Sequence, residues 1–590
     1  MATITINGKV CEFTPGQMIL QVANANGVAI PQYCYHDGLS IVASCRICLG
    51  EVWAPNPRAG NKLEPMMGGK LVPTCQTPAG DGMVVHTDTP KSVANQKAVM
   101  EYLLINHPLD CPVCDQAGEC LLQDFSYKYG RGVSRFEETK VKQPKKDLGP
   151  NVWLYSDRCI MCTRCVRFTR EVAGTSELIV EGRGNQEQID VFPGEPLANE
   201  LSANVVDLCP VGALLDKDFL FAQRVWFLKR TPTIDGYTAS GDNVWAEHNE
   251  GRIYRFKPRT NASLNKWWIT DEVRYSWKHV ASSDRLRSPM RRQYGALVED
   301  DWTRCTDAAV DGLREHLSRA SGRPLVCVVS PMLSCEDAYL LASAALAFDP
   351  NTVLAIGPVP SIGEDKVFPP GAKRDDPKAF TMYAEKAPNA RGVRRVLGAI
   401  AASRGGRVIE FAEAQAMLER NEAGAAIVTG NYPSEWASPE FVRACEKPTF
   451  LVLIDTLASR LIDEADVVLP GATWLEKAGT FENARNMLQA FEQAIPPLEG
   501  AKAEGQIALD LLAALGGRHE RTDAMVRVVD EGPGQVPGAT TVSVSRGRLF
   551  NAADVRAEMS GTQGLEALIP DVKFPSGEGV HEAGMEMVEL

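Results

Sequence analysis

Cysteines are the residues in this sequence best suited to chemistry, and they are concentrated near its start. The chain has 16 cysteines. Twelve precede position 210, and the other four are scattered (Cys305, Cys327, Cys335 and Cys445). Cysteines grouped in this way, in a chain that shows no secretion signal, favour metal binding over disulfides. Eleven of the twelve join one histidine to form three sets of four. We expect the scattered four to be buried as small apolar side chains.

The first set is Cys34, Cys45, Cys48 and Cys75. Three thiolates from one loop and a fourth from farther along are typical of plant-type 2Fe–2S clusters, although the interval between Cys34 and Cys45 is longer than the usual four residues. A zinc site and unrelated buried thiols are the alternatives. Only Cys45 and Cys48 form a close pair, which favours the 2Fe–2S interpretation over zinc.

The second set is His107, Cys111, Cys114 and Cys120. Three thiolates and one imidazole in so short a segment could hold zinc or a 4Fe–4S cluster, and the spacing alone does not decide between them. The segment lies between two more specific iron–sulfur motifs, which favours 4Fe–4S. A neutral imidazole in place of a thiolate should raise the reduction potential of that cluster.

The third set is Cys159, Cys162 and Cys165, completed by Cys209 in a Cys-Pro pair. This is the bacterial ferredoxin pattern and predicts one 4Fe–4S cluster. Four arginines surround it, and we expect them either to form a solvated helix face or to tune the charge of the cluster. These are Arg158, Arg164, Arg167 and Arg170.

The elements around the first two sets follow from local signals. Residues 3–6 and 10–13 flank Asn7-Gly8 and predict a β-hairpin. A helix should open at Thr14-Pro15 and run towards Asn26. Residues 83–87 read as a strand, and 90–106 carry apolar residues at helical spacing. Residues 137–150 are charged, contain two prolines, and predict a linker.

The pattern of apolar residues changes from about residue 280. Apolar runs of strand length occur at 325–329, 353–356, 426–429 and 450–454, with helical patterns between them. This alternation is typical of a parallel sheet with crossover helices. Residues 528–546 are rich in Gly, Pro, Val and Thr, and we expect the end of the chain to be an irregular tail.

Length, net charge and the lengths of apolar runs limit the class of protein. A chain of 590 residues should form roughly three to five domains. The net charge of −13 argues against binding nucleic acid. The first residues do not read as a signal peptide, and no apolar run is long enough to span a bilayer. We therefore expect a cytoplasmic protein that meets a membrane only through partners.

The three motifs, in this order, resemble the G subunit of bacterial NADH–quinone oxidoreductase (respiratory complex I), the large iron–sulfur subunit and counterpart of the mitochondrial 75 kDa subunit. The runs that carry the resemblance are CPVCDQAGECLLQDFSYKYG, RCIMCTRCVRF and DLCPVGALLDKDF. Farther on, ADVVLPGATWLEKAGTFENARNMLQ resembles molybdopterin oxidoreductases.

The resemblance implies a multi-domain fold, α+β and then α/β. It divides the chain into a 2Fe–2S ferredoxin-like (β-grasp) domain at 1–88, a 4Fe–4S domain with one histidine and three cysteine ligands at 89–136, a ferredoxin-like 4Fe–4S domain at 150–222, a degenerate 4Fe–4S domain of the Mo/W-oxidoreductase type at 223–278, a molybdopterin-oxidoreductase-like α/β domain at 279–516 and a tail at 517–590.

The resemblance also implies an electron-relay function. The chain would carry one 2Fe–2S and two 4Fe–4S clusters and pass electrons from a flavin subunit towards quinone. It would supply no catalytic acid, base or nucleophile, and no molybdopterin is expected. The implied partners are the flavin/NADH-binding subunit, a small 2Fe–2S subunit and the quinone-side iron–sulfur subunits. The implied location is peripheral, on the cytoplasmic side of the bacterial inner membrane.

One departure from the family pattern is informative. Molybdopterin oxidoreductases often begin with a fourth cysteine motif, but the corresponding stretch here is TPTIDGYTASGDN. It places Asp235, Thr238 and Asp242 where three cysteines would stand, with Thr270 near the fourth. Hard oxygen ligands suit a thiolate cluster poorly. We therefore expect that this cluster has been lost.

Two rival functions use the same N-terminal motifs. A hydrogenase or formate dehydrogenase catalytic subunit would need further clustered cysteines or a molybdenum ligand, which the scattered cysteines do not provide. The diaphorase part of an NAD-linked hydrogenase typically stops after the third motif, so the long C-terminal half disfavours it.

Overall fold

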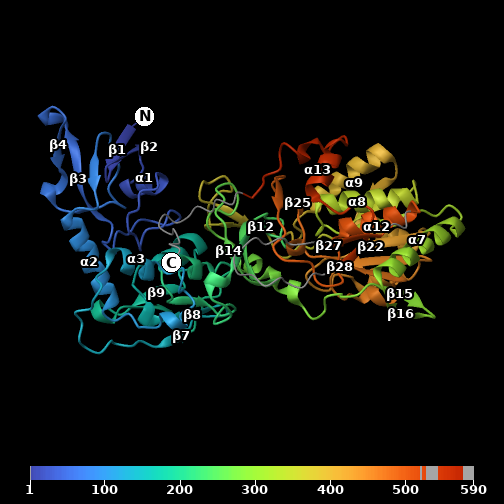
Figure 1. Ribbon diagram of the computed structural model, residues 1–590, viewed down its shortest axis with the longest axis horizontal. Coiled ribbons are helices and arrows are strands. Elements are labelled where there is room, and N and C mark those ends of the chain that lie inside the picture. The colour runs from blue at the N-terminus through green and yellow to red at the C-terminus, as the bar shows by residue number, and fades with distance from the viewer. Residues whose placement is uncertain (1, 518–520, 526–541, 576–590) are drawn as a thin grey trace.

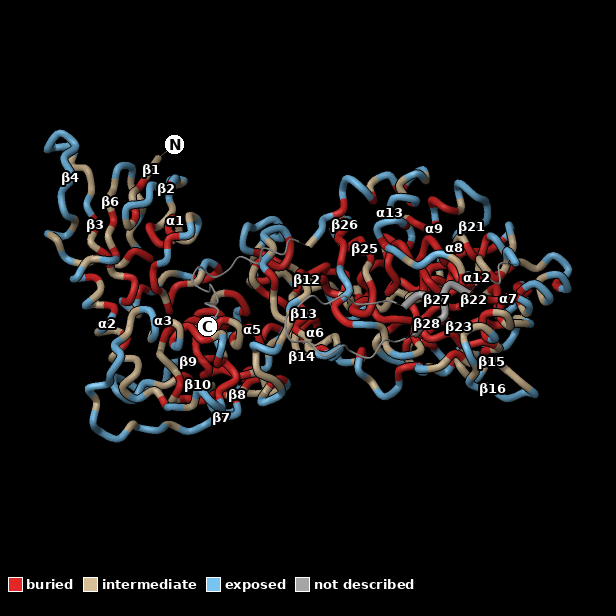
Figure 2. The backbone as a smooth tube through the Cα atoms, viewed as in Figure 1, coloured by how far each residue is buried: buried red, intermediate tan, exposed pale blue. Residues whose placement is uncertain are grey.

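The structure is a computed structural model that describes residues 2–517, 521–525 and 542–575. The chain forms an elongated molecule, with the cysteine-rich units at one end and a larger α/β unit at the other (Figure 1). A three-stranded sheet within residues 229–258 lies between them. Buried backbone is concentrated within each end of the molecule (Figure 2).

The first unit is a mixed sheet that carries one helix. Its strands are β1 (Ala2–Ile6), β2 (Lys9–Phe13), β3 (Leu49–Asn56), β4 (Lys62–Pro65), β5 (Val72–Pro73) and β6 (Val84–His86), ordered β2-β1-β6-β3-β4 with β5 beside β3. The predicted hairpin is confirmed. Asn7 and Gly8 both have positive φ, at 48° and 83°, as a type I′ turn requires.

Helix α1 (Ile19–Ala25) begins later than predicted. The backbone at Gly16 has a φ of 97°, which breaks the helical path that Pro15 was expected to open. The Gln17 side chain accepts a hydrogen bond from the Thr14 backbone N–H at 2.8 Å and closes a turn there instead.

The second unit has the predicted helix, α2 (Pro90–Leu104), with Pro90 in its first turn and Thr89 as its N-cap. A turn at Cys111–Val113 and helix α3 (Leu121–Tyr129) follow. The expected linker is only partly irregular, because its end forms strand β7 (Lys145–Asp147) beside β8 (Val152–Tyr155). Its backbone hydrogen bonds join it to the third unit.

The third unit is built from short elements around the ferredoxin-type cysteines. They are β8, α4 (Arg164–Phe168), a π-helical turn (Thr169–Ala173), β9 (Leu178–Glu181), β10 (Gln188–Val191), α5 (Asn204–Leu208) and β11 (Leu214–Asp216). The three-stranded sheet that follows comprises β12 (Lys229–Ile234), β13 (Asn243–Asn249) and β14 (Arg252–Pro258), with helix α6 (Asp271–Arg274) after it.

The α/β unit contains the predicted parallel sheet. Its strands are β15 (Met290–Gln293), β16 (Ala296–Glu299), β17 (Leu325–Val329), β18 (Val353–Ile356), β21 (Arg407–Ile409), β22 (Ala425–Thr429), β23 (Leu451–Asp455) and β24 (Val467–Pro470), in the order β16-β15-β24-β23-β22-β17-β18-β21. Strands β24 to β21 in that order are parallel, and β15 and β16 add an antiparallel edge.

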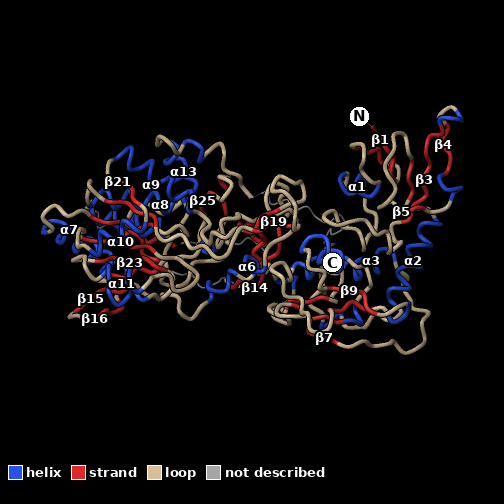
Figure 3. The backbone as a smooth tube through the Cα atoms, turned by 180° about the vertical axis from the view of Figure 1, so that it is seen from behind, coloured by secondary structure: helices blue, strands red, loops and turns tan. Residues whose placement is uncertain are grey.

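Helices cover both faces of this sheet (Figure 3). The larger core contains residues of α7 (Trp302–Arg319), α8 (Cys335–Phe348), α9 (Ala390–Arg404), α12 (Glu504–Leu515) and α13 (Ala552–Ser560). The smaller core contains residues of α10 (Phe411–Glu419) and α11 (Pro439–Cys445). Three further pairs are antiparallel: β19 (Lys366–Phe368) with β20 (Phe380–Met382), β25 (Gly479–Glu482) with β26 (Leu488–Phe491), and β27 (Arg521–Met525) with β28 (Val542–Arg546).

The expectation of an irregular tail is wrong for most of the described part of the C-terminal segment. Helix α13 packs on the larger core through Val555 and Met559, and β27 pairs with β28. Residues 528–541 of the Gly- and Pro-rich run lie outside the described residues. The scattered cysteines are buried as expected, three in the larger core and Cys445 in the smaller. No helix within the described ranges is long and apolar enough to cross a membrane.

Candidate metal centres

The structure brings the four cysteines of the first set together. Cys34, Cys48 and Cys75 are buried and Cys45 is half-buried. A hydrogen bond with Cys45 lowers the pKa of Cys34, and a hydrogen bond with Cys75 lowers the pKa of Cys48. Sulfurs from the loop and from beyond β5 therefore face one another, as a shared inorganic core requires.

The second set lines one small cavity. His107, Cys111, Cys114 and Cys120 surround it, and Gly212 and Arg158 are among the other residues of its wall. Cys120 is the N-cap of α3, so the backbone N–H groups of Leu122 and Gln123 point at its sulfur. Burial lowers the pKa of His107 to about 4, with Arg158 adding to the effect, so its imidazole is neutral as a metal ligand must be.

Gly212 is part of this site although the sequence analysis did not identify it. A Cβ atom at this position would lie 2.1 Å from the Sγ of Cys114, so only glycine leaves the sulfur its place. Its position three residues after Cys209 was the one available signal, since glycine beside a ligand often marks a close backbone approach.

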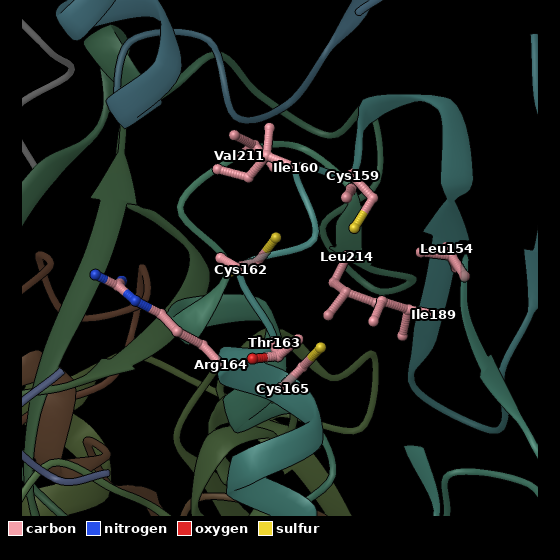
Figure 4. A pocket seen from close by; sticks show the side chains of 12 residues that line it. Leu154, Cys159, Ile160, Cys162, Thr163, Arg164, Cys165, Ile189, Val211 and Leu214 are labelled. Atoms are coloured by element: carbon pink, nitrogen blue, oxygen red, sulfur yellow. The ribbon is translucent and has the colours of Figure 1, made fainter. Parts of the chain in front are cut away.

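The third set surrounds a cavity of its own, lined by Cys159, Cys162, Cys165 and Cys209 (Figure 4). The rest of the lining is mostly apolar, with Leu154, Ile160, Ile189, Val211 and Leu214. Met161 and Thr163, between the cysteines, have positive φ values of 51° and 58°. Their turns aim backbone amides at sulfur; the Met161 N–H donates to the Cys159 sulfur at 3.4 Å.

Backbone amides also surround the sulfur of Cys209. The N–H groups of Val211, Ala213 and Leu214 each lower the pKa of this thiol, although burial raises it more. Amides that converge on sulfur stabilise thiolate and sulfide far more than neutral thiol. The donor set therefore fits an iron–sulfur group, whose iron would offset the cost of burying ionised thiolates. Among the residues that the structure describes, no three side chains are arranged around a single metal ion.

Three of the four arginines near the third set do not form a solvated helix face. Arg158, Arg164 and Arg167 are 2–3% exposed, and only Arg170 faces solvent, so for the buried three the first alternative considered from the sequence is wrong. Spacing could not separate these cases, because residues around one short helix can face either solvent or core.

Oxygen atoms fill the place of the degenerate fourth motif. Asp235 is fully buried and accepts hydrogen bonds from the backbone N–H groups of Tyr237 and Thr238, at 2.8 and 3.0 Å, and from the Ser240 hydroxyl at 3.0 Å. Burial raises its pKa to about 6. Thr270, near the expected fourth position, caps α6 instead. The side-chain oxygens of Asp235 and Thr270 thus accept hydrogen bonds from groups of the protein itself.

Comparison with family models defines the class of protein: a multi-domain iron–sulfur protein whose C-terminal part has the molybdopterin oxidoreductase fold. The matches are a 2Fe–2S iron–sulfur cluster binding domain (1–90), an NADH-ubiquinone oxidoreductase-G iron–sulfur binding region (96–135), an NADH-quinone oxidoreductase subunit 3 ferredoxin-like domain (149–215), an NDSU1/NuoG-like 4Fe–4S domain (228–278) and molybdopterin oxidoreductase (371–514).

Curated relatives are more specific, and the chain is similar in sequence to the G subunit of NADH-quinone oxidoreductase. The Rickettsia bellii G subunit is 38% identical over 342 residues, 58% of this chain and 47% of that protein. The Reclinomonas americana 75 kDa subunit is 39% identical over 341 residues, 58% and 47% of the two chains. The Candida albicans mitochondrial 78 kDa subunit is 43% identical over 301 residues, 51% and 40%. The resemblance inferred from the motifs is thus confirmed.

The chain spans about half the length of the curated relatives it matches. A solved structure of NAD+-reducing [NiFe]-hydrogenase in the H2-reduced state is 28% identical, with a TM-score of 0.32, and the match covers 38% of this chain and 91% of that one.

Proposed function

We propose that this chain is an electron-transfer subunit of an NADH:quinone oxidoreductase, relaying electrons from a flavin subunit towards quinone. The observation that carries the proposal is the convergence of twelve side chains into three four-membered sets within adjoining loops. The sequence similarity to the G subunit supports it, because those relatives are named as parts of this enzyme.

The proposed ligands follow the three sets. They are Cys34, Cys45, Cys48 and Cys75 for one 2Fe–2S cluster, His107, Cys111, Cys114 and Cys120 for one 4Fe–4S cluster, and Cys159, Cys162, Cys165 and Cys209 for another. Such clusters, when bound, accept and release single electrons. No cluster is proposed at Asp235, and no molybdopterin is proposed in the α/β unit.

The chain's own residues bring these sites close together and shield them from water. Tyr33 is fully buried, and its phenol lies near the sulfurs of both Cys45 and Cys120, where burial and these thiols raise its pKa. Its ring packs on Phe125 of α3, 5.2 Å between centroids. The first two sets thus meet across one apolar wall. The residues supply no proton transfer; their function is to bind, space and desolvate.

Partners and location belong to the same proposal. The chain would contact a flavin/NADH-binding subunit, a small 2Fe–2S subunit and the quinone-side iron–sulfur subunits, on the cytoplasmic side of a bacterial inner membrane. A hydrogenase-type catalytic function finds no support in the described residues, since the four remaining C-terminal cysteines lie in two separate cores.

Metal analysis with EPR on the anaerobically purified chain tests the proposal. We expect about ten irons per chain and signals from one 2Fe–2S and two 4Fe–4S centres. The Cys159→Ala variant should lose about four irons and one 4Fe–4S signal, while Cys445→Ala, a matched change outside the sets, keeps all three. Stoichiometric zinc in a colourless protein would overturn the proposal.

A further inference from the structure

Two arginines of α4 connect the loop of the first set to the loops of the third. The Nη2 atom of Arg167 donates hydrogen bonds to the backbone carbonyl oxygens of both Cys34 and Cys162, the latter at 3.3 Å. One nitrogen atom therefore joins a member of each set. Nη1 of Arg167 donates to the carbonyl of Ser40, in the loop between Cys34 and Cys45.

Arg164 repeats this pattern one turn earlier. Its Nη2 donates to the carbonyl of Tyr35, the residue after Cys34, at 2.5 Å. Its Nη1 donates to the carbonyl of Leu208, the residue before Cys209, at 3.3 Å. Each guanidinium thus spans the same two cysteine sets, and the rigid fork of arginine suits such paired carbonyl contacts.

The charge of these two side chains is poorly compensated. Both are 3% exposed, and across the described part of the chain neither makes an ion pair with a carboxylate. The Nε atom of each lacks a hydrogen-bond partner. Arg158 differs, because Asp110 pairs with it at 2.9 Å. A buried cation without a counter-charge is costly, so a negative group is expected beside it.

The Cys34 and Cys162 sulfurs and the Glu171 carboxylate are the negative groups within reach of Arg167. Apart from that of Ser40, the carbonyl groups that Arg164 and Arg167 bind belong to Cys34 and Cys162 or to the neighbours of Cys34 and Cys209, so both guanidinium charges lie beside both sets of sulfurs. His36, in the same loop as Cys34, stacks against Trp268. The Glu171 carboxylate accepts hydrogen bonds from Ser40 and Arg170.

We propose that Arg164 and Arg167 are positioning residues that serve two clusters at once, by fixing the distance between their loops and by stabilising the reduced state of both. The inference rests on the proposed cluster sites. A positive charge between two centres favours the extra electron on either, so it raises both midpoint potentials. A residue that only holds one loop in place would change the midpoint potential of one cluster.

The experiment is a redox titration followed by EPR on the full chain, with iron content measured for each variant. Arg167→Gln removes the charge and keeps similar length. We expect both the 2Fe–2S cluster and the Cys159-set cluster to become harder to reduce, by about tenfold in the reduction equilibrium, or about 59 mV for a one-electron couple. Arg167→Lys retains the charge and should restore most of both shifts.

Arg170→Gln is the matched control, since Arg170 lies three residues along and faces solvent. It should leave both potentials unchanged. A shift confined to one cluster in Arg167→Gln, an equal shift in the control, or no shift at normal iron content would overturn the inference. Absence of signals in the unmodified chain would instead defeat the proposed function.

A variant that does not retain iron still decides the question. If Arg167→Gln loses iron, the pattern of loss is read directly and Arg164→Gln is titrated in the same way. Joint loss of the 2Fe–2S and Cys159-set signals, with the His107-set signal retained, agrees with a shared bridge. Loss of one of the two with the other intact contradicts it.

Discussion

Gly212 shows how little space the second set leaves. A Cβ at this position would displace the Cys114 sulfur or the Gln116 side chain, whose Cβ lies 3.1 Å away. We predict that Gly212→Ala loses the His-ligated cluster, with about four fewer irons per chain and retention of the other two EPR signals.

Gly132→Ala is the control for this change, because a Cβ there meets nothing within 4 Å. It should keep the full iron content. Full iron in Gly212→Ala would show that Cys114 is not held where the structure places it.

Residue spacing revealed the twelve proposed ligands but not their surroundings. The spacing of ligands such as Cys159, Cys162 and Cys165 can be read from the sequence, because one loop has to surround one cluster. Burial is decided by what packs against a residue from elsewhere. Arg164 and Arg167 are buried by the loop around Cys34, more than a hundred residues away in sequence, and no local pattern announces that contact.

At the scale of elements, β13 and β14 hold the loop of the second set through an ion network. Glu119, beside Cys120, accepts hydrogen bonds from Arg255 at 3.0 Å and Lys257 at 2.7 Å. Arg255 also binds Glu247 at 2.6 Å. Burial raises the pKa of Glu247, but Arg255, Lys257 and Arg230 outweigh it and lower the pKa to about 2. The ionised Glu247 carboxylate therefore stabilises the folded chain above pH 4.5, and this contribution is lost as the pH falls through about 2.

We predict that Glu119→Gln destabilises this junction by about 2 kcal/mol, because it leaves the partly buried Arg255 and Lys257 short of a partner. The visible absorbance of the protein should bleach at a temperature lower by roughly 5 °C at neutral pH. Glu138→Gln, a change at an exposed site, provides the comparison. Equal bleaching temperatures for the two variants would mean that the network does not hold the loop.

Elements with strong local signals were predicted correctly, and those decided by distant contacts were not. The Asn7-Gly8 hairpin, α2 and the buried parallel strands carry their own patterns. The start of α1 was placed too early because Gly16 turns the chain. β7 and α13 gain their order by packing on β8 and α8, which composition does not reveal.

For the molecule as a whole, the exposed segment 131–144 crosses from the second unit to the third without regular structure. Lys142 lies exposed within it. We predict that trypsin cuts the isolated native chain after Lys142, and that the two fragments still elute together in size-exclusion chromatography. Contacts beyond the cut, such as Ser40 with Glu171 at 2.6 Å and Leu121 with Pro210 at 3.0 Å, hold them.

Denaturing gels should show two bands from the single native peak. Release of the N-terminal fragment under native conditions would contradict the packing of the first two units on the third.

The hydrogen bonds of the loop around Asp235 have a consequence for how the chain folds. It is closed by hydrogen bonds from Tyr237, Thr238 and Ser240, so it needs no inorganic group delivered before it can adopt its shape. The adjoining strand β14 carries Arg255 and Lys257, which grip Glu119 beside Cys120. Under the proposed function this segment binds no cluster of its own, so we expect it to fold before iron is delivered and to position the loop of Cys120 through Glu119.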